Sequence, residues 1–133
     1  MAAELDYAFV ADFARVEAGK LTAVGASYTK LRTAVMPTNH IFSIAGRLRA
    51  PDDTEEIAII IRVLTPGDGI NPEFTWTVTP GPESDRYDGK LGILFALTTG
   101  ITITCEGLVE VLIEVDGQHA RRLAFDVELA AAS

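Results

Sequence analysis

The sequence has few of the residues that most often carry chemistry or cross-links. Among 133 residues there is one cysteine, Cys105, and there are two histidines, His40 and His119. A single cysteine excludes a disulfide within the chain and weakly favours a reducing compartment. Neither histidine has another histidine, a cysteine or an acid at a spacing typical of metal ligands. We therefore expect no bound metal and no cofactor.

Runs of positive charge and long apolar runs are also missing. The longest basic run is Arg121-Arg122, and the formal net charge is -8. Because nucleic-acid binding needs clustered positive charge, we expect no nucleic-acid partner. No uncharged apolar stretch approaches the roughly 20 residues that span a bilayer. The opening MAAELDYAFVADF does not follow a signal or transit peptide pattern, so the sequence predicts a cytoplasmic protein without membrane insertion.

The composition is that of a globular chain with one core. Hydrophobic residues make up 48% of the sequence and charged residues 23%. A chain of this length buries about two-thirds of its unfolded surface and needs no metal or disulfide to fold. We expect residues 1–133 to form a single domain.

Apolar and polar residues alternate along most of the chain, which is the pattern of half-buried strands. The segments LVEVLIEV and RLAFDVELA alternate clearly, and the Asp116-Gly117 pair between them predicts a hairpin turn. HIFSIAGRLR, EFTWTV and KLGILFALT also alternate, and a short ITIT strand follows Gly100. EIAIIIRVL is apolar on both faces apart from Arg62, so it predicts a strand inside a sheet.

These segments, separated by turn signals, predict an all-β protein. The expected fold is a two-sheet antiparallel β-sandwich of about eight or nine strands, Ig-like or C2-like in type. Inward-facing residues of the two sheets should share one core that contains Phe42, Trp76, Phe95, Ile113 and Phe125.

Residues 5–18 are ambiguous because their apolar residues fit either a helical stripe or a strand face. The strand is favoured, since Glu17-Ala18-Gly19 resembles a three-residue hairpin loop and KLTAVGAS reads as the returning strand. Asp12 would then be a solvent-side or edge carboxylate with a structural role, not a catalytic one.

The N-terminal pattern DYAFVADFARVEAGKLTAVGAS combines Asp12, Gly19-Lys20 and Gly25, and LVEVLIEVDGQHARRLAFDVEL forms the C-terminal hairpin. Both resemble a bacterial, mainly actinobacterial, family of small all-β proteins known only as a domain of unknown function. The resemblance covers most of the chain and implies a β-sandwich. It supplies no activity and no functional residues.

Two loops are rich in acidic residues. Asp52 and Asp53 lie in one, and Asp85 and Asp88 lie in the other. If the strands run up and down, both loops fall at the same end of the sandwich, together with Glu17. Calcium binds six to eight oxygen ligands, which such loops can supply. No spacing matches a recognised calcium loop, so we expect these four aspartates to be exposed and to bind no ion tightly.

Four apolar residues fall on the faces that should be polar in an isolated sandwich. They are Ile60, Leu64, Leu94 and Leu112. An uncovered apolar patch marks an interface, whereas a covered one would lie under the segment YTKLRTAVMPTN. The sequence leaves both possibilities open.

The predicted function is therefore association, either with another protein or with further copies of the chain, without catalysis. No acid, base and nucleophile set is apparent, so we do not expect an enzyme. Both histidines should be solvent-facing, and Cys105 should be a buried, inert thiol. The alternative function is a ligand- or calcium-binding module that uses the acidic loops.

Overall fold

The computed structural model describes residues 2–67 and 69–130, which form ten strands and no helix. The strands are β1 (Glu4–Glu17), β2 (Lys20–Ala26), β3 (Lys30–Thr33), β4 (Thr38–Pro51), β5 (Ile57–Leu64), β6 (Glu73–Val78), β7 (Arg86–Tyr87), β8 (Lys90–Ile103), β9 (Gly107–Val115) and β10 (Gln118–Leu129).

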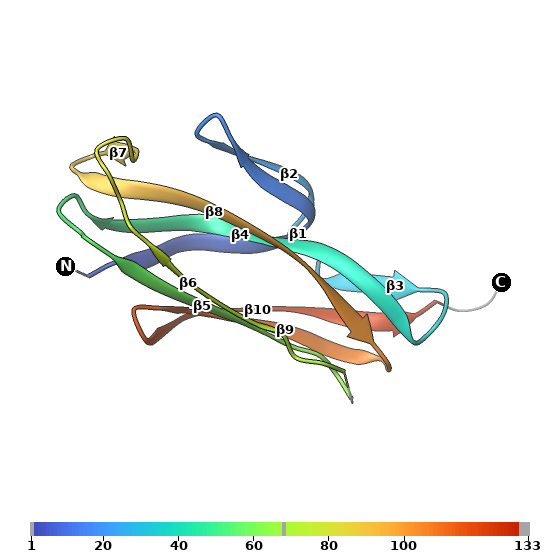
Figure 1. The fold of residues 1–133 in the computed structure, drawn as a ribbon. Helices are drawn as coiled ribbons and strands as arrows, with labels where there is room; N and C mark the ends of the chain where they lie inside the picture. The colour runs from blue at the N-terminus through green and yellow to red at the C-terminus, as the bar shows by residue number, and fades with distance from the viewer. Residues whose placement is uncertain (1, 68, 131–133) are drawn as a thin grey trace.

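The strands form two sheets of five strands each, shown in Figure 1. Sheet A has the order β2-β1-β4-β8-β7, and sheet B has the order β3-β10-β9-β5-β6. All paired strands are antiparallel except β3 and β10, which are parallel. The all-β prediction is confirmed, and β5 lies inside its sheet as its two apolar faces predicted.

The main hydrophobic core lies between the sheets, because alternate residues of each strand point to the same face. In β5 every second residue, from Ile57 to Val63, is fully buried, while the residues between them keep some exposure. Phe42, Phe95, Ile113 and Phe125 belong to this core, and Trp76 packs against it as a partly buried side chain. The expected shared core is confirmed.

The strand count and one pairing were predicted wrongly. β3 and β7 are four and two residues long, too short for a visible alternation. KLGILFALT and ITIT form the single strand β8, because Gly100 continues the ladder opposite Ile41. The sheets are not wholly antiparallel, since β3 runs parallel to β10.

Residues 4–17 form β1, so the helical alternative was wrong. β1 pairs with β4 as far as Ala11 and with β2 from Ala11 onward. The second half of β1 and all of β2, residues 12–26, form a hairpin arm on the side of sheet A that faces away from sheet B (Figure 1). Ala11, Ala14 and Ala45 form a small buried cluster there, and the Ala14 N–H donates to the buried Ser43 Oγ at 3.0 Å. Small side chains allow this close approach.

The turn of the hairpin arm is shorter than predicted. Glu17 pairs directly with Lys20, so the loop has two residues, Ala18 and Gly19, with φ of 51° and 73°. Asp116-Gly117 has the same geometry, which confirms the predicted C-terminal hairpin turn. Two positive φ values are the signature of a type I′ turn, which favours Asn, Asp or Gly at its first position. Alanine at position 18 is therefore strained.

We expect Ala18→Gly to stabilise the protein by about 1 kcal/mol, because an L side chain costs roughly that much in the left-handed region. Ala26→Gly is the matched control. Ala26 lies in a strand without positive φ, so its replacement should destabilise by about 0.5–1 kcal/mol. Urea unfolding of both variants measures the two changes, and equal signs would contradict the strain at Ala18.

Candidate functional site

The four aspartates considered for calcium are all exposed, as the sequence predicted. Their two loops also meet at one end of the molecule, since Arg86 Nη2 donates to the backbone carbonyl of Asp52 at 3.3 Å. The guanidinium of Arg86 therefore lies between the two loops. Within residues 2–67 and 69–130, no three His, Cys, Asp or Glu side chains are grouped as metal ligands.

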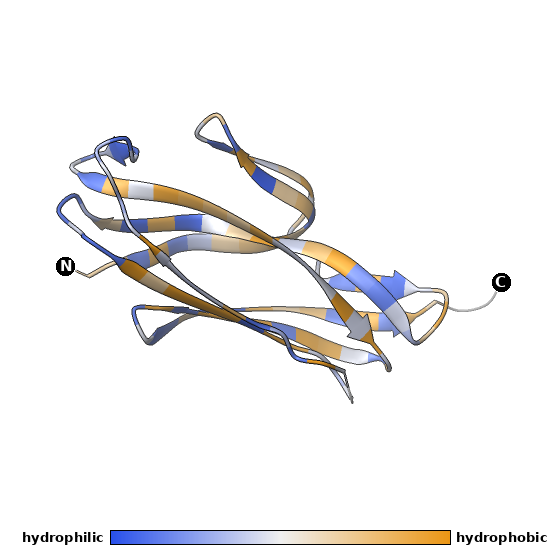
Figure 2. Ribbon diagram, in the orientation of Figure 1, coloured by the Kyte–Doolittle hydropathy of each residue, from blue (hydrophilic) through white to orange (hydrophobic). Residues whose placement is uncertain are grey.

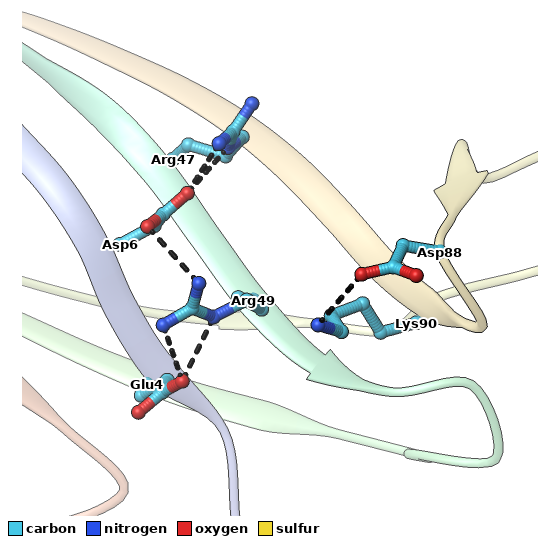
Figure 3. Close-up of polar contacts among 6 residues, drawn as sticks. All are labelled: Glu4, Asp6, Arg47, Arg49, Asp88 and Lys90. Carbon is cyan, nitrogen blue, oxygen red and sulfur yellow. Dashed lines mark hydrogen bonds and ion pairs between the residues drawn. The ribbon is translucent and has the colours of Figure 1, made fainter.

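A ladder of ion pairs crosses the outer face of sheet A between β1 and β4, shown in Figure 3. Arg47 donates through Nε and Nη2 to Asp6 Oδ2, with 2.8 Å for the Nε bond. Arg49 bonds Glu4 Oε1 at 2.8 Å through Nε and lies 3.3 Å from Asp6 Oδ1. The hydrogen bond from Arg47 holds the pKa of Asp6 below its usual value. The ladder joins β1 to β4 through the carboxylates of Glu4 and Asp6.

Leu94 lies beside this ladder and not with the other predicted interface residues. The guanidinium of Arg47 lies between two aromatic rings, 5.1 Å from the centre of Tyr7 and 5.2 Å from the centre of Tyr87. Leu94, Arg47 and Tyr87 are among the residues that line a cavity of about 140 Å³. Because Leu94 pairs with Arg47, it belongs to the outer face of sheet A.

Ile60, Leu64 and Leu112 lie together on the outer face of sheet B. Leu112 on β9 pairs with Arg62 of β5, so it is the diagonal neighbour of both Ile60 and Leu64. Leu64 pairs with Glu110, which makes Leu108 a further diagonal neighbour. Leu108 is 38% exposed, and the other three are half-buried. We call these four residues the apolar zigzag.

Ion pairs border the apolar zigzag on the same face. Arg62 bonds Glu114 at 2.8 Å and Glu73 at 3.0 Å, and Arg122 bonds Glu110 at 2.8 Å. The hydrogen bonds to Glu114 and Glu73 raise the pKa of Arg62. The side chains of these pairs are partly exposed to solvent, where an ion pair contributes little to stability. The pairs hold the side chains of Arg62 and Arg122 next to the apolar zigzag.

The apolar zigzag is not covered by the segment at residues 28–39. β3, which lies in that segment, pairs with β10 at the edge of sheet B and extends the sheet instead of crossing its outer face. In the described part of the chain, no strand lies over the outer face of β5 and β9 (Figure 1). Of the two possibilities left open by the sequence, the uncovered surface holds for Ile60, Leu64 and Leu112.

His40 is half-buried, contrary to the expectation of a solvent-facing residue. Its ring stacks on Phe42 with centres 5.4 Å apart, and its Nε2 lies 2.9 Å from the hydroxyl of Tyr28. Burial lowers the pKa of His40, with an opposing effect from the charge of Asp12, and burial raises the pKa of Tyr28. The two groups therefore form a neutral hydrogen-bonded pair. The inward orientation of His40 could have been recognised from the sequence, because His40 precedes Phe42 and Ile44 at a spacing of two residues.

We expect the His40 pair to make stability pH-dependent between about pH 5 and 7. A histidine has a pKa near 6.5 when unfolded, and here the folded value is lower, so the unfolded chain binds more protons in this window. The free energy of unfolding should fall as the pH drops below about 6.5, by at most about 1.4 kcal/mol per unit. His40→Gln should reduce this fall. His119→Gln is the comparison at an exposed position, and urea midpoints at about pH 5 and pH 7 rank the variants.

Asp12 is an exposed carboxylate with a structural neighbour, as predicted. It lies opposite Gly25, which has φ of 62°, and a side chain at position 25 would collide with the Asp12 carboxylate. In this chain the glycine at position 25 therefore leaves room for the Asp12 carboxylate. Cys105 differs from expectation because its thiol is exposed, at the turn that follows β8.

Comparison with known families places the chain. A profile described as "Family of unknown function (DUF6941)" matches residues 6–128. The chain belongs to this family. No match was found among curated proteins. Of residues 2–67 and 69–130, none forms a helix with the length and apolar character to cross a membrane.

Proposed function

We propose that this protein acts without catalysis, by associating with protein chains, and that a second copy of the chain is its first partner. The observation that carries the proposal is the uncovered apolar zigzag on the outer face of sheet B. Three of its members were selected from the sequence as interface candidates, and β5 and β9 bring them together. A contiguous apolar patch rimmed by polar residues is typical of interaction sites.

The charges of this face favour self-association. The whole chain has a net charge of -8, which would drive copies apart. On the outer face of sheet B, however, cationic and anionic residues are nearly balanced. They are Lys30, Arg32, Arg62 and Arg122 against Glu73, Glu110, Glu114, Asp126 and Glu128. Two copies related by a twofold axis can meet here with opposite charges in register.

Each apolar residue of this surface would contribute less free energy on association than a fully exposed residue would. Burying a fully exposed Leu or Ile contributes about 1.5–3 kcal/mol. Ile60, Leu64 and Leu112 are already half-buried, so each would contribute only part of this amount. We therefore expect an association that depends on concentration in the micromolar range and not an obligate assembly.

The alternative of a calcium-binding module has less support. Its four aspartates are exposed, and Arg86 bonds the carbonyl of Asp52 between the two loops. The proposal also includes four further expectations from the sequence. They are a single domain with an Ig-like or C2-like sandwich, a family found mainly in actinobacteria, a cytoplasmic location and no nucleic-acid partner.

Light scattering across a dilution series tests the proposal. We expect a weight-average mass above 14.3 kDa at high micromolar concentration that falls on dilution. A mass of 14.3 kDa at every concentration would refute self-association.

A further inference from the structure

The long strand β8 leaves most of one edge unpaired. Along its whole length β8 pairs with β4 on one side, but on the other side β7 pairs only with Lys90 and Leu91. Gly92 donates its N–H to the carbonyl of Asp85 at 3.1 Å, so the backbone N–H of Gly92 points away from β4. Every second residue after Gly92 therefore presents its backbone polar groups to the open edge.

Five residues of β8 follow this rule, namely Leu94, Ala96, Thr98, Gly100 and, near the end of the strand, Thr102. The first four form the open edge, and no backbone N–H among them has an acceptor within the described residues. Unpaired N–H and C=O groups in a row are a template for another strand.

The edge also lacks the features that normally prevent strand pairing. The segment 91–105 contains no charged residue and no proline, and Figure 2 shows β8 without a hydrophilic stretch beyond its first residue. The other edges of the two sheets are protected by charge, proline, brevity or irregular backbone. These edges are β3 with Lys30 and Arg32, β6 between Pro72 and Pro80, the two-residue β7, and β2 with Lys20 and the left-handed Gly25. The parts of β1 before Ala11 and of β10 before Asp126 are also unpaired on one side, and they carry the charges of Glu4 and Asp6 and of Arg121 and Arg122.

We infer that β8 pairs antiparallel with β8 of a second copy, which joins two A sheets into one continuous sheet. This inference rests on the proposed association and adds an edge contact to the face of sheet B. A second copy fits because its β8 brings neither charge nor proline into an acidic molecule, and because antiparallel pairing of identical strands is twofold symmetric. An axis at Leu97 places Ala96 opposite Thr98 and Leu94 opposite Gly100, so all four free residues are used.

Gly100→Pro and Gly100→Ala form a matched pair of variants. A proline is tolerated in an edge strand where its nitrogen faces away from the neighbour, so the fold should persist while the edge is blocked. An alanine Cβ at this position would meet Ile41 Cγ1 at 3.7 Å, an ordinary contact, and it keeps the N–H. We expect Gly100→Pro to weaken association at least tenfold and Gly100→Ala to leave it unchanged.

Two measurements on the unaltered chain do not depend on a variant folding. Amide hydrogen exchange should show that Leu94, Ala96, Thr98 and Gly100 become protected as concentration rises. The exposed Cys105 is the only cysteine, so a spin label can be attached there directly. With an axis at Leu97, eight residues on each side at about 3.3 Å per residue place the two labels roughly 50 Å apart.

The outcomes separate this inference from the proposed function. A chain that stays monomeric at all concentrations refutes both. A chain that associates with equal strength in both Gly100 variants, with unprotected edge amides, overturns the β8 pairing and leaves the sheet B surface as the contact. Selective weakening by Gly100→Pro together with amide protection supports the pairing.

Discussion

Gly46→Ala is expected to destabilise the protein by at least about 3 kcal/mol, although it adds a single methyl group. Gly46 is buried in the middle of β4, and an added Cβ would collide with the backbone carbonyl oxygen of Tyr7 on β1. It would also lie 3.0 Å from Cα of Ala8 and 3.0 Å from Cζ of Phe95. Overpacking in a core typically costs 1–3 kcal/mol, and a collision with backbone cannot be relieved by a rotamer change. β1 would have to move away from β4.

Gly100→Ala is the control for this prediction, since it places a methyl group in a strand of the same sheet without a collision. We expect Gly100→Ala to change the free energy of unfolding by less than about 1 kcal/mol. Chemical denaturation at low protein concentration compares the two. Equal effects would contradict the close approach of β1 to β4 at Gly46.

Phe125→Ala is expected to cost about 3–5 kcal/mol. Phe125 is 1% exposed and contacts the rings of Phe42 and Tyr28 edge-on, with centres 5.7 Å and 5.1 Å apart. It lies on β10 of sheet B, whereas Phe42 lies on β4 of sheet A. Its removal would leave a cavity between the sheets and expose one side of the His40 ring, whose centre lies 6.0 Å away.

Phe13→Ala serves as the comparison because the same side chain is 44% exposed on the hairpin arm. Its loss should cost less than about 1.5 kcal/mol, since much of its surface is already in water. Thermal or urea unfolding ranks the two variants. A cost for Phe13→Ala equal to that for Phe125→Ala would mean that the core is not where these contacts place it.

The parts of the fold that depend on period-two alternation were predictable. β5 and β9 bury every second residue for most of their length, β10 does so at Phe125 and Val127, and the Asp116-Gly117 turn sets the pairing of β9 with β10. The sequence could not reveal where β1 leaves β4. That change of partner occurs at Ala11, within an unbroken strand, and it depends on small side chains on the neighbouring β4.

The candidate surface was predictable in part for the same reason. Ile60, Leu64 and Leu112 could be selected as outward-facing by alternation, but their adjacency depends on the pairing of β5 with β9, which are far apart in the chain. Leu94 fits the same alternation and lies on the other sheet. The pairing of His40 with Tyr28 was missed because Tyr28 precedes a strand too short to recognise.

The most direct test of the proposed interface is sedimentation equilibrium of Leu112→Lys beside Thr29→Lys. Leu112 is the centre of the apolar zigzag and lies between Arg62 and Arg122, so a lysine there adds a third positive charge to an uncovered surface. Thr29 is exposed and lies between β2 and β3, away from the strands β5 and β9 that carry the apolar zigzag. We predict a weight-average mass well below that of the unaltered chain for Leu112→Lys, reaching 14.3 kDa when combined with Gly100→Pro, and an unchanged mass for Thr29→Lys. Equal masses for Leu112→Lys and Thr29→Lys in an associating protein would contradict an interface on the outer face of sheet B.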